Sequence, residues 1–352
     1  MRSAQVAAAP GSGHGRAQGA PGLQADRLLR LAADRGEGRV SLFLPGRRAG
    51  QSFPDDRIRF TGLVRRVGNT LRQDGFSASE AEAVLGGAWD LVDDLWLWET
   101  AGNGLAVFTS PESTRCFWVP APLRELATIG DRFAVGPLLP LLNGTAPYLV
   151  LLLTGDETRL FRGTRFEVEE ILASSLLFDD GMSLRLHFRR LDAVVREVAG
   201  EEKMPLVVLG ARHLQRLYRE VNTYPDLVLP DGTGDVSLDE VHRRSWTVVE
   251  PVLLADEHAA VAECEAGGGR VITEPAEVLA AARDGRVGTL FVSAEAARYA
   301  GMSVVVRLSE AGAADELVDQ AVVAVLAGCG SVITLPVLRM PGRGPLAATL
   351  RA

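Results

Sequence analysis

Two kinds of side chain in this sequence could act on a phosphate-bearing substrate, namely carboxylates in the middle of the chain and arginines near its start. The carboxylates that could support a metal-dependent hydrolase are Asp156, Asp179, Asp180 and Asp192, and His187 is a candidate base near them. Such hydrolysis needs several carboxylates that converge on one point. A lone histidine on a helix is more often packed or solvated than catalytic. The sequence therefore indicates an enzyme only as an alternative.

Arginine is the dominant cation, because the chain of 352 residues has 36 arginines and one lysine, Lys203. The neighbours of Lys203 are Glu-Glu-Lys-Met-Pro, which excludes a nucleotide-binding loop of the Gly-x-x-x-x-Gly-Lys-Ser/Thr type. Residues 1–72 hold 13 arginines against 5 acids, a net charge of +8, while 73–142, 143–245 and 246–352 carry -7, -4 and -5. This distribution predicts either a head that contacts nucleic acid and an acidic remainder that contacts protein, or a head that neutralises its own acidic domain.

Seven arginines of the head are candidates for RNA contact. Two lie in the loop after a predicted strand at Arg39–Leu44, and five surround a predicted helix that Asp55 could cap, whose apolar positions face a core. The guanidinium group is suited to phosphate oxygens because its donors form a planar fork. The candidates are Arg47, Arg48, Arg57, Arg59, Arg65, Arg66 and Arg72.

The middle of the chain has a clear pattern of strands and a helix. Tyr148–Leu153 is an apolar run typical of a strand buried on both faces, and Arg159–Arg162 predicts the second strand of a hairpin. An irregular loop over Ser174–Met182 precedes a helix from Ser183, whose apolar residues share one face. The charged residues expected on the opposite face are Arg185, Arg189, Asp192 and Arg196. A loop before a basic helix is either a functional tip or an ordinary connector.

Alternating helices and strands on both sides of this region predict an α/β, multidomain protein. A capping box at Ser79 and Glu82 predicts the start of a second N-terminal helix, and a strand at Ser303–Leu308 is expected in a mixed C-terminal sheet. We expect the following divisions: a disordered tail at 1–23, an α+β N-terminal domain at 24–142, an α/β middle domain at 143–235 and an α/β sandwich domain at 236–352.

The chain lacks the sequence features of membrane and secreted proteins. No apolar run approaches the roughly 18–20 residues that a membrane span needs, and the first 22 residues contain no apolar core of a signal peptide. The three cysteines lie far apart without paired spacing, which predicts neither a disulfide framework nor a zinc site. We therefore expect a cytoplasmic protein that has no membrane partner.

Several short motifs follow one another in a single order from about residue 25 to the C-terminus. They are Val40–Pro45, Asn103–Phe108, Gly130–Phe133, the hairpin Tyr148–Arg162, Tyr218–Pro225 and Arg339–Ala348. In this order they resemble the bacterial branch of the archaeo-eukaryotic release-factor and Pelota superfamily, specifically its third subfamily. The resemblance implies an N-terminal domain, an RNase-H-like middle domain, and a C-terminal α/β domain that meets a translational GTPase in release factors.

The resemblance also shows where this chain departs from release factors. They carry a Gly-Gly-Gln tip in the loop before the long middle-domain helix. This chain has Asp179, Asp180, Gly181 and Met182 there, with no glutamine nearby. The codon-reading element Asn-Ile-Lys-Ser would fall near Asp56–Arg59, and of the Tyr-x-Cys-x-x-x-Phe element only a phenylalanine remains.

The sequence and the resemblance together indicate a non-catalytic, ribosome-associated factor. We expect it to bind the ribosome or its RNA through the basic N-terminal region, and a translational GTPase or another protein through the acidic C-terminal domain. No catalytic residue, cofactor or metal is expected. The alternatives are a nucleic-acid hydrolase that uses the middle-domain carboxylates and an interaction module outside translation.

Overall fold

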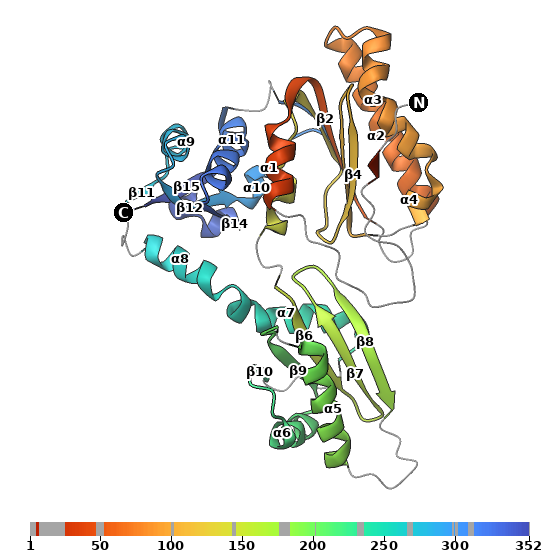
Figure 1. The fold of residues 1–352 in the computed structure, drawn as a ribbon, viewed down its shortest axis with the longest axis vertical. Helices are drawn as coiled ribbons and strands as arrows, with labels where there is room; N and C mark the ends of the chain where they lie inside the picture. Colours follow the sequence, from red (N-terminus) through yellow and green to blue (C-terminus); the bar gives the residue numbers. More distant parts are fainter. Residues whose placement is uncertain are drawn as a thin grey trace. The chain divides into compact units, whose positions relative to one another are not determined.

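The structure is a computed structural model with mixed α/β architecture. It describes residues 5–6, 25–46, 53–99, 102–142, 146–175, 184–200, 202–230, 236–265, 270–297, 299, 302–308 and 313–351. Three sheets confirm the α/β, multidomain fold class. The chain forms two compact units, one from residues 1–143 and 260–352 and the other from residues 144–259 (Figure 1). The expected tail at 1–23 lies almost entirely outside the described residues. None of the described helices is both long and apolar enough to cross a membrane.

The first unit contains a six-stranded sheet in the order β1-β4-β3-β2-β5-β13. Its strands are β1 (Gln5–Val6), β2 (Arg35–Pro45), β3 (Gly104–Thr109), β4 (Thr114–Val119), β5 (Leu126–Arg132) and β13 (Val305–Arg307). The strands β2, β3, β4 and β5 form antiparallel pairs, whereas β13 pairs with β5 in parallel. The expectation that Ser303–Leu308 belongs to the C-terminal sheet is therefore wrong. Gly130 permits this docking, because a Cβ there would lie 2.8 Å from Cδ1 of the buried Leu308.

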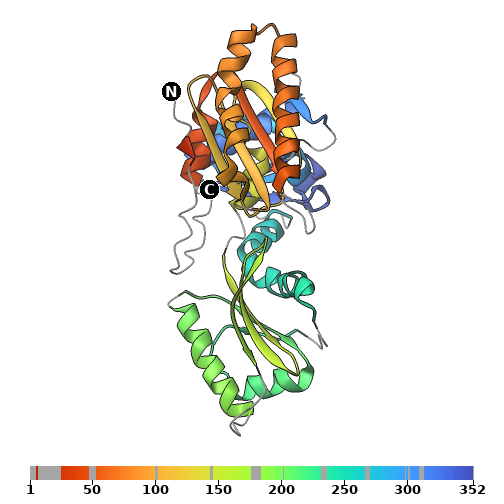
Figure 2. The same ribbon diagram turned by 90° about the vertical axis from the view of Figure 1, so that its right-hand side faces the viewer.

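Helices from the N-terminal part pack on this first sheet (Figure 2). They are α2 (Phe53–Gln73), α3 (Ala78–Asp93) and α4 (Leu95–Glu99), while α1 (Ala25–Ala33) precedes β2. The expectation that Asp55 caps α2 is wrong, because the helix begins at Phe53 and Asp55 lies in its first turn, where the helix dipole favours a carboxylate. The capping box is also two residues earlier than expected. The Ser77 hydroxyl accepts from the Glu80 N–H at 3.2 Å, and the Glu80 carboxylate accepts from the Ser77 N–H at 2.8 Å.

The second sheet of this unit has the order β11-β15-β12-β14, with β12 and β14 parallel. Its strands and the surrounding helices are β11 (Val271–Ile272), β12 (Val287–Ser293), β14 (Ser331–Leu335), β15 (Leu346–Leu350), α9 (Pro275–Arg283), α10 (Ala294–Ala297), α11 (Ala313–Ala327), η1 (Gly136–Leu141), η2 (Val337–Arg339) and η3 (Pro341–Arg343). On one face Leu290 and Val292 pack with Val322 of α11 and Val278 of α9, so these helices cover the sheet.

A buried carboxylate joins distant parts of this unit. Asp319 of α11 accepts a hydrogen bond from the Tyr299 hydroxyl at 2.9 Å. Burial raises the pKa of Asp319 to about 6, although the Tyr299 hydrogen bond and the charge of Arg132 act in the opposite direction. The ionised form of Asp319 is therefore less favourable in the folded chain than its protonated form.

The second unit is built on a five-stranded sheet in the order β10-β9-β6-β7-β8. Its strands are β6 (Tyr148–Leu153), β7 (Glu157–Gly163), β8 (Val168–Ser175), β9 (Leu206–Gly210) and β10 (Leu227–Val228). The predicted hairpin is confirmed, with Leu151 opposite Leu160. The irregular loop expected from Ser174 begins too early, because β8 continues to Ser175. This edge strand is largely exposed, so it lacks the apolar alternation that would have revealed it.

Helices cover both faces of this sheet. They are α5 (Leu184–Ala199) and α6 (Arg212–Val221) on one face and α7 (Leu238–Leu253) on the other, and α8 (Ala255–Glu265) follows α7. Phe188 and Tyr218 pack on the α5–α6 face, while the Tyr148 hydroxyl on the other face lies 3.0 Å from the Ser245 hydroxyl of α7. The domain boundary expected at residue 236 falls within this unit, just before α7. The division into three domains stays a prediction.

Candidate nucleic-acid interface

The five candidate arginines of α2 lie on the outer sides of the helix, and its remaining side is buried. Phe60, Val64 and Val67 lie in the core of the first sheet. The arginines at positions 65, 66 and 72 are exposed, and those at positions 57 and 59 are half-buried. This arrangement follows from the helical period, which gives α2 one apolar and one charged side.

Three of these arginines already meet carboxylates of the same unit. Arg57 pairs with Asp93 at 3.0 Å, Arg59 pairs with the buried Asp56, and Arg66 pairs with Glu125. Asp93 and Glu125 lie in the acidic segment 73–142. Their pairing favours the interpretation that much of the basic head neutralises its own domain. Among the described residues, Arg65 has no ion-pair partner.

Six predicted site residues lie outside the described residues. Two are loop arginines of the head and four form the position of the Gly-Gly-Gln tip, and the six are Arg47, Arg48, Asp179, Asp180, Gly181 and Met182. Their assignment stays a prediction from the sequence.

A second group of arginines lies on the solvent side of α5 and α6. On α5 the spacing i, i+4, i+11 gives one stripe, and on α6 the spacing i, i+4, i+7 gives another. The exposed residues of these stripes are Arg185, Arg189, Arg196, Arg212, Arg216 and Arg219. The sequence reasoning noted the α5 arginines but missed those of α6. The regular spacing within Arg-His-Leu-Gln-Arg-Leu-Tyr-Arg was the signal that could have identified them.

Asp192 does not share the exposed face of α5, contrary to expectation. It is buried, with an exposed fraction of 2%. Its carboxylate accepts hydrogen bonds from the Thr223 N–H at 3.0 Å and from the Thr223 hydroxyl at 2.6 Å. Buried carboxylates need such donors. Asp192 therefore fixes the chain just after α6 against the middle of α5.

The described candidates for the hydrolase alternative are Asp156, Asp192 and His187. Asp156 lies in the exposed turn between β6 and β7, and Asp192 is held by Thr223. His187 is half-buried with its Nε2 3.3 Å from the Thr158 hydroxyl, and its pKa is lowered by burial and by the charge of Arg190. Within the described parts of the chain, no three His, Cys, Asp or Glu side chains gather as a metal site.

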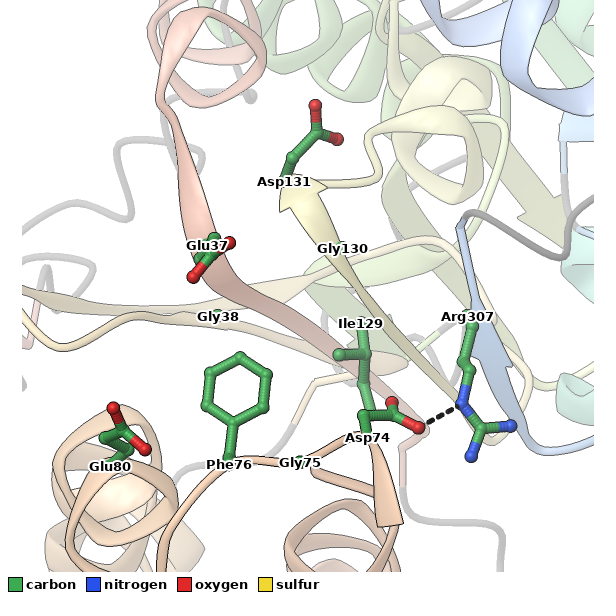
Figure 3. A pocket seen from close by; sticks show the side chains of 10 residues that line it. All are labelled: Glu37, Gly38, Asp74, Gly75, Phe76, Glu80, Ile129, Gly130, Asp131 and Arg307. Carbon is green, nitrogen blue, oxygen red and sulfur yellow. Dashed lines mark hydrogen bonds and ion pairs between the residues drawn. The ribbon is translucent and has the colours of Figure 1, made fainter. Parts of the chain in front are cut away.

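A groove in the first unit has a volume of about 670 Å³, and the charged residues of its lining are four acids and one arginine (Figure 3). Glu37 of β2, Glu80 of α3 and Asp131 of β5 contribute carboxylates, while Arg307 of β13 donates to Asp74 at 2.7 Å. An acidic lining repels phosphate. The groove is therefore unsuited to RNA, and its ion pair joins β13 to the end of α2.

Similar solved structures include the archaeal translation termination factor aRF1 (17% identity, 93% of this chain and 97% of that chain covered, TM-score 0.27). Others are Archaeoglobus fulgidus Pelota (15%, 93% and 92%, TM-score 0.36) and S. cerevisiae Dom34, a translation termination-like factor (10%, 72% and 74%, TM-score 0.38). With TM-scores below 0.5, these likenesses support no further conclusion about this chain.

The family comparison is more specific. No curated protein matches the chain. Residues 178–286 match the model of bacterial archaeo-eukaryotic release factor family 3. This segment includes α5 and α6 and begins beside the position of the Gly-Gly-Gln tip. The resemblance found in the sequence is thereby confirmed over residues 178–286, where the chain has the sequence pattern of bacterial archaeo-eukaryotic release factor family 3.

Proposed function

We propose that this chain is a non-catalytic, release-factor-like protein that binds the ribosome or its RNA. The observation that carries the proposal is the match over residues 178–286, because the matched model is that of a bacterial release-factor family. The sequence contains no Gly-Gly-Gln at any position. The proposed role is therefore occupancy of a site on the ribosome without hydrolysis.

The chemistry of the tip supports the absence of hydrolysis. Cleavage of the peptidyl-tRNA ester requires a water held and oriented at the carbonyl carbon. Gly181 retains one flexible backbone position, but the Met182 thioether does not orient water as an amide does. The carboxylates of Asp179 and Asp180 have the same charge as the phosphate-rich acceptor end of tRNA, so they repel it.

The partners proposed for the two ends of the chain follow from charge. The arginines of α2 and of the loop before it would contact RNA phosphates, with Arg65 the α2 arginine best placed to do so because it is exposed and has no described partner. The acidic segment 246–352, with a net charge of -5, would meet a translational GTPase or another protein.

Cosedimentation with purified bacterial ribosomes through a sucrose cushion tests this proposal. We expect the protein to pellet with ribosomes at 50 mM salt and less at 200 mM salt, because phosphate contacts release counterions. Serum albumin is the control for trapped protein. Pelleting equal to that of the protein without ribosomes, at both salt concentrations, would overturn the proposal.

A further inference from the structure

We propose that the outer surface of α5 and α6 binds the phosphate backbone of double-helical RNA. This α5–α6 surface consists of Arg185, Arg189, Arg196, Arg212, Arg216 and Arg219. The choice of RNA rests on the function proposed above, and the inference adds a contact site that is separate from α2.

Both helices present their arginines on the same side of the second unit. They cover one face of its sheet through Phe188 and Tyr218, so their opposite sides face away from the sheet together (Figure 1). The contacts that hold them beside each other include the Phe188–Tyr218 ring contact, the hydrogen bonds of Asp192 with Thr223 just after α6, and the ion pair between Arg185 and Glu220 at 2.5 Å. The α5–α6 surface therefore lies on two neighbouring helices that cover the same face of the sheet.

The charge of this surface is largely unneutralised. The helices α5 and α6 contain seven arginines against three acids, a net charge of +4, although the whole segment 143–245 has a net charge of -4. Besides Arg185, only Arg196 of this surface pairs with a carboxylate in the described parts of the chain, namely Asp192 at 3.6 Å. The other four arginines of the surface have no ion-pair partner among the described residues. This contrasts with α2, where three of five arginines are paired.

The spacing of the arginines fits a rigid row of anions. The α5 stripe from Arg185 to Arg196 extends about 16 Å along the helix axis, at about 1.5 Å per residue. A duplex with the charge density of double-stranded DNA, about one charge per 1.7 Å, presents roughly nine phosphate charges over that length. A flexible acidic peptide would lose conformational entropy on matching the same stripes. Charge and regularity therefore favour a duplex over an acidic protein segment.

The composition of the surface favours the backbone of RNA over its bases. Single-stranded RNA is usually bound by stacking its bases on aromatic side chains. The aromatic residues Phe188 and Tyr218 are fully buried, and the exposed positions of α5 and α6 carry no Phe, Tyr or Trp. Guanidinium groups can instead donate to phosphate oxygens in pairs.

The test compares two triple variants of the full chain with equal loss of charge. The first replaces the α6 arginines (Arg212→Gln, Arg216→Gln and Arg219→Gln). The control replaces three exposed arginines of the other unit (Arg283→Gln, Arg286→Gln and Arg339→Gln). Fluorescence anisotropy measures binding of a 20-base-pair RNA duplex between 50 and 300 mM salt. Far-ultraviolet circular dichroism verifies that both variants keep their helices.

We expect the α6 variant to bind the duplex roughly 100-fold more weakly at 150 mM salt, and its salt slope to fall by about 2 to 3, because each phosphate contact contributes about 0.7–0.9 to the slope. The control should change affinity by no more than about 3-fold, since distant exposed charges are screened. Equal losses in the two variants would overturn the inference. So would tighter binding of single-stranded RNA than duplex, or binding of polyglutamate without binding of RNA.

Ribosome cosedimentation of the same variants separates this inference from the proposed function. Pelleting that falls in the α6 variant and persists in the control supports both. Wild-type protein that pellets with ribosomes, together with an α6 variant that pellets equally well, would overturn the α5–α6 surface and leave the proposed function standing.

Discussion

Replacement of Asp192 with alanine should destabilise the junction between α5 and the chain after α6. The buried carboxylate accepts two hydrogen bonds from Thr223, at 3.0 and 2.6 Å. Arg196 adds an ion pair at 3.6 Å, but its side chain is more than half exposed. These contacts hold the two arginine stripes in their common orientation, so their loss affects the position of a proposed binding surface.

The magnitude follows from the environment of each contact. A hydrogen bond to a charged group contributes about 1.5–3 kcal/mol. Thr223 is exposed, so water can replace part of what its donors lose, and the lower end of the range applies to each bond. Asp192→Ala should therefore lower the local free energy of unfolding by about 3 kcal/mol, and Arg196→Ala by less than about 1 kcal/mol because an exposed pair is weak.

Hydrogen–deuterium exchange measured by mass spectrometry on peptides of α5 and α6 is a suitable assay, since it reports local opening in a chain of two units. A loss of about 3 kcal/mol predicts roughly 150-fold faster exchange in these peptides. Thr223→Ala combined with Asp192→Ala should be less damaging than the sum of the single changes, with a coupling of about 1–2 kcal/mol. Exchange of Asp192→Ala no faster than that of Arg196→Ala would refute the reasoning.

Three further outcomes are expected. The raised pKa of Asp319 means that this carboxyl group holds its proton more tightly in the folded chain than in the unfolded chain. The protonated group therefore contributes about 3 kcal/mol to the free energy of unfolding below about pH 4, and this contribution is lost as pH rises through about 6. Asp319→Asn should therefore reduce the pH dependence of the denaturation midpoint between pH 4 and 7, and an identical dependence would contradict the assignment. Replacing the five α2 arginines with glutamine should flatten the salt slope of ribosome binding by about 0.7–0.9 per lost contact, whereas an unchanged slope would mean that they only neutralise acids such as Asp93 and Glu125. Limited proteolysis should cut near residues 143–147 and 228–236 and release compact fragments, and cleavage concentrated within α5 would contradict the domain division.

The local elements were predictable because their patterns are local. The apolar run of β6 and the helical period of α5 indicated both elements within one or two residues of their observed bounds. The position of β13 was not predictable in this way, since its partner β5 lies more than 170 residues earlier in the chain. Likewise β8, an exposed edge strand, has little apolar signal.

The candidate site shows the same limit. A helical wheel placed Asp192 among exposed arginines because its angular position lies at the edge of the buried face, and its partner Thr223 is 31 residues away. The α2 arginines were correctly placed on a helix, but sequence spacing could not reveal that Arg57 meets Asp93, 36 residues later. The α6 stripe, by contrast, follows from spacing alone and could have been found in the sequence.

Release of peptide from ribosomes loaded with peptidyl-tRNA is the measurement that tests the account most directly. The protein is added at a concentration at which cosedimentation shows it bound, and a Gly-Gly-Gln or equivalent release factor is the positive control. The account predicts release at the spontaneous rate, because Asp179 and Asp180 repel the acceptor end and Met182 does not orient water. Release above the spontaneous rate that is abolished by changes at positions 179–182 would contradict it.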